Sequence, residues 1–199
     1  MAGAFPISTS KFQSLGIKSI QNTIISKTVS GKKLARQIDG QRWSFTARII
    51  TGKRSDVYGE LMAFIVKQRS GKENFTIVPQ EIEDARGTAS GTPNGTASAG
   101  ATSITLGGSG TGTLKAGDFI KFANHDKVYM VVADQSDIST GSLTIEPPLT
   151  TAVSSSDIQY DNVPFTVYLT NDIQEFGVVG ADKDGNALYQ FEFDVEESL

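Results

Sequence analysis

The sequence predicts a mainly β protein: a β-barrel or sandwich domain with one α-helix, and a small, barrel-like β module inserted into it. Three observations support this prediction. Alternating apolar and polar residues recur near both ends of the 199-residue chain, and one stretch has helical spacing. In the middle, a segment rich in Gly, Ser, Thr and Ala precedes a second region with strand patterning.

The N-terminal region is expected to form a three-stranded meander over residues 19–50. Two turn signals, Ser30-Gly31 and Asp39-Gly40, separate runs with strand character. In the third run the apolar residues alternate with polar ones, as in a half-buried strand. Its expected core residues are Trp43, Phe45, Ala47 and Ile49.

Residues 54–71 have helical spacing. Their apolar residues Val57, Leu61, Phe64 and Ile65 fall on one face. Ser55 is expected to cap the N-terminus and Gly71 to close the C-terminus. A short strand is predicted next, ending at Pro79.

The middle of the chain changes character twice. Residues 87–113 are almost entirely small, which predicts a flexible linker. Residues 119–133 then show the pattern of a β-hairpin around a polar turn, and residues 141–149 add a strand. Residues 150–161 look like a loop.

The C-terminal region returns to long strand patterns, above all in residues 187–195, where Tyr189, Phe191, Phe193 and Val195 share one face. An apolar face of this kind needs a partner layer, and the N-terminal sheet is the expected one. We therefore predict that residues 1–85 and 160–199 build one domain and that residues 86–159 are inserted into it. Pairing of the strand ending at Pro79 with the strand beginning at Val163 would bring the ends of the insert together.

Composition excludes several classes of function. A formal charge of −4 argues against nucleic acid as the main partner. With no Cys and one His, we expect no disulfide, no thiol nucleophile and no metal centre built from Cys or His. We also expect no cofactor. The Gly-rich segment lacks the Gly-Lys-Ser/Thr of a phosphate loop, and no catalytic constellation is evident. No leader pattern and no window of roughly 18 apolar residues is present, so we expect assembly in a cytoplasm without membrane insertion.

Two groups of residues are candidates for contacts with other molecules. Basic residues cluster around the second and third strands, either as a contact strip for an acidic neighbouring subunit or as the polar face of a sheet: Lys33, Arg36, Arg42 and Arg48. On the insert, three residues could touch a receptor by stacking, or the aromatic ones could be the core of the insert: Phe122, His125 and Tyr129.

Several segments together resemble a family of tailed-bacteriophage virion proteins. They are the strand around "GQRW", the helix end from "AF" to "KQ", and the hairpin "GDFIKFANHDKVY". The organisation resembles that of distal tail proteins, whose β-barrel assembles into a hexameric ring continuous with the tail tube. The resemblance implies a non-enzymatic structural protein that contacts its own copies, the tail tube and the baseplate hub. It would lie in the virion tail tip after assembly in the host cytoplasm. A carbohydrate- or receptor-binding tail module is the alternative.

Overall fold

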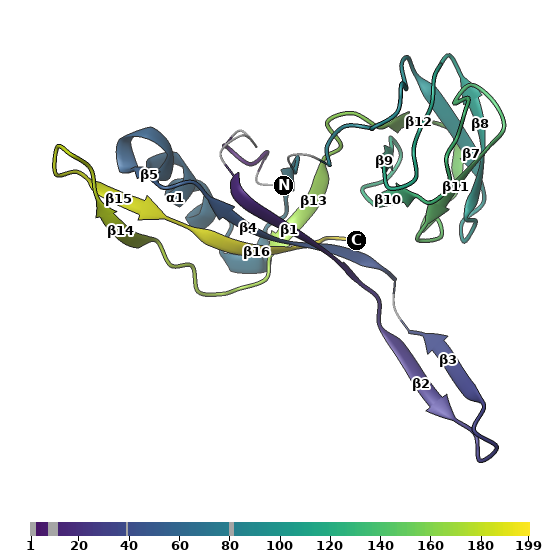
Figure 1. Ribbon diagram of the computed structural model, residues 1–199, viewed down its shortest axis with the longest axis horizontal. Coiled ribbons are helices and arrows are strands. Elements are labelled where there is room, and N and C mark those ends of the chain that lie inside the picture. The colour runs from purple at the N-terminus through teal and green to yellow at the C-terminus, as the bar shows by residue number, and fades with distance from the viewer. Residues whose placement is uncertain (1–2, 8–11, 39, 80–81) are drawn as a thin grey trace.

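An open, antiparallel five-stranded sheet forms the centre of the molecule (Figure 1). The computed structural model describes residues 3–7, 12–38, 40–79 and 82–199. In spatial order, the strands of the central sheet are β1 (Phe12–Ile20), β4 (Arg42–Ile49), β16 (Glu192–Glu197), β13 (Phe165–Leu169) and β6 (Phe75–Ile77).

The alternation predicted for residues 42–49 and for the last strand run is confirmed. On β4, Trp43, Phe45, Ala47 and Ile49 are all buried, and Phe191, Phe193 and Val195 are buried at the other end of the chain. Strands β4 and β16 are direct neighbours. The two ends of the sequence therefore share one hydrophobic core, as the patterning indicates.

The predicted helical stretch consists of three short elements, which are the π-helix η2 (Arg54–Tyr58), the helix α1 (Gly59–Lys67) and the 3-10 turn η3 (Ser70–Lys72). Leu61 and Ile65 are buried, and Phe64 meets Phe75 edge-on with 5.3 Å between ring centroids. The residues predicted to cap and to end the helix were both wrong. Ser55 donates a hydrogen bond to the carboxylate of Asp56 rather than capping a backbone N–H. The helix stops at Lys67, and Arg69 and Ser70 turn the chain with positive φ values of 53° and 59°, so Gly71 is not the terminator.

A closed six-stranded barrel forms a second body beside the sheet (Figure 1). In chain order its strands are β7 (Pro93–Ala97), β8 (Ser103–Gly108), β9 (Phe119–Phe122), β10 (Val128–Val131), β11 (Ser142–Glu146) and β12 (Val153–Gln159). The antiparallel pairing of β9 with β10 confirms the predicted hairpin, and β11 confirms the predicted strand that follows.

Two predictions for the barrel region were wrong. The Gly-rich segment is not a linker, because it supplies β7 and β8, and the segment 150–161 contains β12. At Gly95 a small residue is needed because side chains fill the interior of the barrel. A Cβ on Gly95 would lie 2.7 Å from Ile104 and 2.8 Å from Phe122, so a larger side chain has no room.

The predicted meander was also wrong. Strand β4 pairs with β1, and the segment between them leaves the sheet as a separate hairpin of β2 (Thr23–Lys27) and β3 (Lys33–Gln37). We call residues 23–37 the arm. Its turn follows the first predicted signal, with Gly31 at φ +82°. Asp39, in the second signal, lies outside the described residues.

A third sheet lies on the other side of the centre (Figure 1). It contains β14 (Gly177–Ala181), β15 (Ala187–Gln190) and the short β5 (Gly52–Lys53), with β14 at its edge. Strands β15 and β16 follow one another along the chain, so the C-terminal segment belongs to both sheets.

The barrel is inserted where the sequence predicts that the chain leaves and returns. Strand β6 pairs with β13, and the N–H of Val163 donates to the carbonyl of Glu83 at 3.0 Å. All six barrel strands lie within the predicted insert, residues 86–159. The fold class is thus confirmed, with the closed barrel in the insert and open sheets around it. The residue boundaries of the two predicted domains stay a prediction.

Candidate functional site

The junction between the barrel and the central sheet is built around two buried charges, Lys127 and Glu197. Glu197 continues the alternation of Phe193 and Val195, so the pleat of β16 directs it into the core rather than to solvent. Lys127 directly precedes β10 of the barrel. The Lys127 ammonium forms an ion pair with the Glu197 carboxylate, and the two side chains are 2% and 0% exposed.

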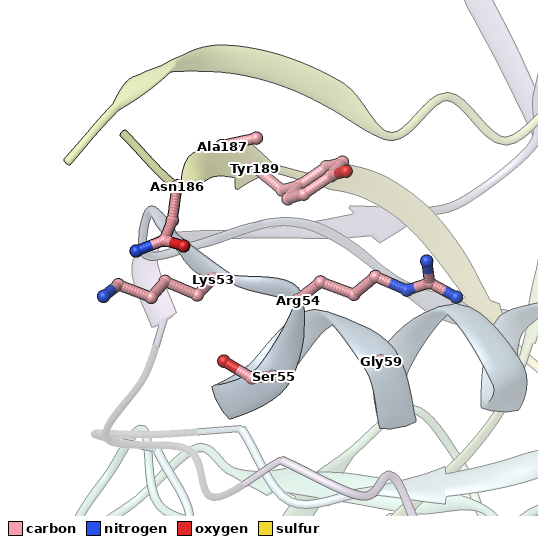
Figure 2. Close-up of a pocket in the computed structure, with 7 residues that line it drawn as sticks. All are labelled: Lys53, Arg54, Ser55, Gly59, Asn186, Ala187 and Tyr189. Atoms are coloured by element: carbon pink, nitrogen blue, oxygen red, sulfur yellow. The ribbon is translucent and has the colours of Figure 1, made fainter. Parts of the chain in front are cut away.

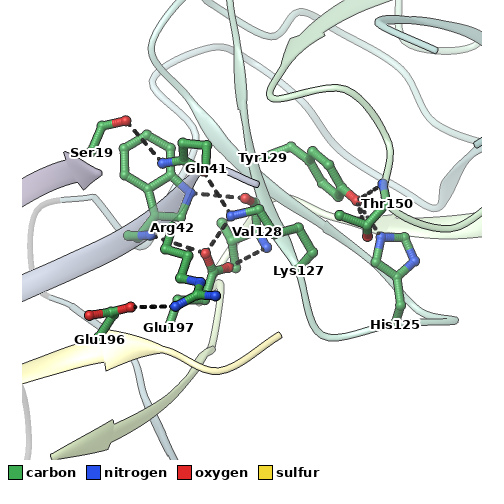
Figure 3. Close-up of polar contacts among 11 residues, drawn as sticks. Ser19, Gln41, Arg42, His125, Lys127, Val128, Tyr129, Thr150, Glu196 and Glu197 are labelled. Carbon is green, nitrogen blue, oxygen red and sulfur yellow. Dashed lines mark hydrogen bonds and ion pairs between the residues drawn. The ribbon is translucent and has the colours of Figure 1, made fainter. Parts of the chain in front are cut away.

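Every polar group in this pair has further partners (Figure 3). Glu197 accepts hydrogen bonds from the N–H of Val128 at 2.9 Å and from the N–H of Trp43 at 3.1 Å. Lys127 also donates to Gln41 Oε1 at 2.8 Å, and Gln41 in turn donates to Ser19 Oγ. Because buried charges are costly unless they are paired and hydrogen-bonded, this network makes the close contact of the two bodies possible.

Aromatic packing completes the junction. The Trp43 indole N–H donates to the carbonyl of Val128 at 2.9 Å. The Trp43 ring meets Phe119 of the barrel at 5.1 Å, and Phe119 meets Phe165 of the sheet at 5.7 Å. Phe119 thus belongs to the core of the central sheet although its strand is part of the barrel. The barrel is held in place by packing and by directional bonds together.

The electrostatics of the pair follow from its burial. Removal from water raises the pKa of Glu197 and lowers the pKa of Lys127, and each charge opposes the shift of the other. Sequence reasoning missed both residues. A signal was present for Glu197, because it occupies the apolar face of a strongly alternating strand and a charge there requires a partner.

The three candidate contact residues on the insert lie together, but largely inside it. Phe122 and Tyr129 are buried in the barrel core, and their rings are 5.7 Å apart. His125 is half-buried and stacks on Phe122, while its Nε2 lies 2.8 Å from the Tyr129 hydroxyl. The faces of the two aromatic rings are therefore not available to stack on a ligand.

The four candidate interface residues fall into two groups. Lys33 and Arg36 lie on the exposed arm. Arg42 and Arg48 lie on the polar face of β4, where Arg42 pairs with Glu196 at 3.0 Å and Arg48 donates to Gln190 at 2.7 Å. The structure thus does not join them in a single strip.

The arm is the most exposed β structure in the described residues. All ten residues of β2 and β3 are exposed, including Ile24, Ile25 and Leu34 at 56%, 56% and 49%. Its turn is nonetheless well bonded, with Thr28 Oγ1 accepting from the N–H of Lys32 at 3.0 Å. Figure 1 shows the arm projecting away from both the sheet and the barrel.

An open cavity of about 550 Å³ lies where the start of the helical segment faces β15 (Figure 2). Lys53, Arg54, Ser55 and Tyr189 line it, and the Lys53 ammonium is 2.5 Å from the carboxylate of Asp182.

No group of three or more His, Cys, Asp or Glu residues in the described chain is placed to hold a metal ion. No helix among those described has the length and apolar character to cross a membrane.

Comparison with protein families gives one match, which coincides with the barrel. Residues 83–163 match the model of "Distal tail protein pb9, B domain". The matched range begins where β6 has ended and stops at Val163, just before β13. The chain therefore contains a domain that matches the bacteriophage distal tail protein family. No curated protein matches it.

A distal tail protein domain supports the assignment of this chain to the structural proteins of the phage tail. The matched residues are those of the barrel, and the junction around Lys127 and Glu197 is the place where this B domain meets the rest of the chain.

Proposed function

We propose that this distal tail protein assembles into a ring of its own copies, six in number, that joins the tail tube to the baseplate hub. Its work is mechanical rather than enzymatic. We further propose that it assembles in the host cytoplasm before it becomes part of the virion. The main support for this proposal is the arm, because its exposed apolar side chains are typical of a segment that binds another protein.

An isolated two-stranded hairpin is marginally stable in water. In the arm, apolar side chains lie on both faces, because Ile25 pairs with Ala35 on one face while Ile24 and Leu34 occupy the other. Lys27 also lies directly opposite Lys33, and like charges in that position repel each other. These features are unfavourable in a free monomer, and a neighbouring subunit would remove them by covering the apolar residues and neutralising the lysines.

The junction between the barrel and the central sheet also supports a mechanical function. A ring that transmits force between tube and hub needs subunits whose parts do not move independently. Inter-domain interfaces within a chain commonly allow relative motion unless they are large and apolar. Here the aromatic contacts of Trp43 and Phe119 and the buried ion pair oppose such motion.

The test is to locate the protein and count its copies. Cryo-electron microscopy of the intact virion is expected to show a six-membered ring between tube and hub, and mass photometry of the purified protein is expected to show the same assembly. The variant Ile24→Ser/Leu34→Ser is expected to reduce ring formation, while Val132→Ser, which changes an exposed apolar residue on the barrel, leaves it unchanged. A protein that is strictly monomeric and absent from the virion would contradict the proposal.

A further inference from the structure

The edge of the molecule opposite the arm also exposes apolar residues. Residues 172–179 run from the connection after β13 into the edge strand β14, and we call them the β14 edge. Ile173, Val178 and Val179 are 87%, 60% and 54% exposed. In Figure 1 the β14–β15 hairpin and the arm extend from the central sheet in opposite directions.

The arm and the β14 edge have opposite charges. The arm contains four basic residues, Lys27, Lys32, Lys33 and Arg36, and no acidic one, whereas the β14 edge contains Asp172 and Glu175 and no basic residue. In the described part of the chain no ion pair involves any of these six side chains. Each surface therefore combines exposed apolar side chains with charges that form no ion pair with the other described residues of the monomer.

We propose that the arm of one subunit docks on the β14 edge of a second copy of this chain. The inference rests on the proposed ring and names the two surfaces that form it. The apolar residues of the arm, Ile24 and Leu34, would cover Val178 and Val179. The basic residues of the arm would lie against Asp172 and Glu175.

The charges disfavour the simplest alternative, a contact between two arms, because basic arms repel one another. Contact between different surfaces at opposite ends of a molecule is heterologous, and heterologous contacts generate closed rings when the rotation closes. In such a ring every arm and every β14 edge is occupied. No exposed hairpin would then remain to pair with other proteins.

Charge reversal tests the pairing directly. One variant reverses the arm (Lys27→Glu/Lys33→Glu/Arg36→Glu), and another reverses the β14 edge (Asp172→Lys/Glu175→Lys). We expect each variant alone to remain monomeric in mass photometry and an equimolar mixture to regain the ring, because each reversed surface then meets its complement. The matched control Glu146→Lys/Asp157→Lys reverses two exposed acidic residues on the barrel and should form the ring like the wild type.

Cross-linking tests the same contact in the assembled ring, since the chain contains no native cysteine. The variant Ser26→Cys/Val179→Cys, oxidised in the ring or in the virion, is expected to give a ladder of covalent oligomers up to the ring size. The control Ser26→Cys/Val132→Cys should give none. A ring that forms without this ladder, or that survives reversal of the β14 edge, would overturn the docking inference and leave the proposed ring standing. Absence of any ring from the wild type would instead contradict the proposed function.

Discussion

Glu197 lies inside the junction because the pleat of β16 places it on the same face as Phe193 and Val195. Its carboxylate is tolerated there because it accepts two backbone N–H groups and pairs with Lys127. Removing one partner of such a pair leaves an uncompensated buried charge, which is far more costly than the loss of an exposed pair. At the scale of single residues, this makes the pair more important for joining the barrel to the sheet than any surface charge.

His125 is the other residue whose chemistry depends on its surroundings. Burial lowers its pKa below the usual 6.5, and the positive charge of Lys121 adds to this effect. The neutral ring fits its contacts, because Nδ1–H can donate to Asn124 Oδ1 while Nε2 accepts from the Tyr129 hydroxyl. Protonation of Nε2 would remove that acceptor.

We therefore predict that protonation of His125 destabilises the protein when the pH is lowered. Because the folded-state pKa lies below the unfolded value, the contribution is fully present above pH 6.5 and is lost as the pH falls through the folded pKa. Denaturant unfolding at about pH 7 and about pH 5 should show a smaller decrease for His125→Gln than for the wild type. The chain has one His, so an NMR titration of its ring protons reports this site alone. A midpoint at or above 6.5 would contradict the prediction.

At the scale of elements, β7 and β8 show how small residues can form regular strands. Their sequence offers few apolar side chains, but Ile104 and Leu106 both point into the barrel, where they are buried. The remaining space is filled by residues from other strands, among them Phe122 and Ile145. Gly95 on β7 is thus required by the packing of the barrel, because a Cβ there would meet Ile104 and Phe122.

We predict that Gly95→Ala destabilises the protein by about 1–3 kcal/mol, because the added methyl group would meet the side chains of Ile104 and Phe122 at less than 3 Å. Urea unfolding followed by circular dichroism would measure this change. Gly177→Ala is the matched control, since a Cβ there has no heavy atom within 4 Å and should change the stability by less than about 0.5 kcal/mol. Equal effects of the two substitutions would show that the barrel is less tightly packed around Gly95.

At the scale of the whole molecule, the barrel and the central sheet meet at the only Trp of the chain. Trp43 contacts Phe119 and the carbonyl of Val128, so its fluorescence reports whether the junction is closed. The same junction transmits any force between the barrel and the proposed ring. Its stability therefore decides whether the protein acts as one body.

We predict that Glu197→Gln opens the junction before the rest of the chain unfolds. In the wild type, the denaturation curves from Trp43 fluorescence and from far-UV circular dichroism should coincide. In Glu197→Gln, the fluorescence transition should come first, with a stability loss of about 3–5 kcal/mol, because Lys127 loses its buried partner. The control Glu196→Gln, which affects a partly exposed pair with Arg42, should cost at most about 1 kcal/mol. Coincident curves in Glu197→Gln would argue against a separable junction.

Elements with strong periodicity can be predicted from local sequence alone. Three local patterns place apolar side chains in the core. They are the alternation of β4 and of residues 189–195, the spacing of Leu61 and Ile65, and the hairpin of β9 and β10. The insertion of one β module into another, and the family, could also be read from such segments. In each case, neighbouring residues carry the information.

The remaining features could not be predicted from local sequence, because they depend on contacts between residues far apart in the chain. Residues 93–108 form strands because they pair within a closed barrel. Strand β4 pairs with β1 and not with β3. Lys127 and Glu197 are 70 positions apart, and no local pattern links an exposed-looking Lys to a C-terminal Glu. The arm is exposed for the same reason: the rest of the described chain does not cover its apolar residues, and periodicity cannot show this.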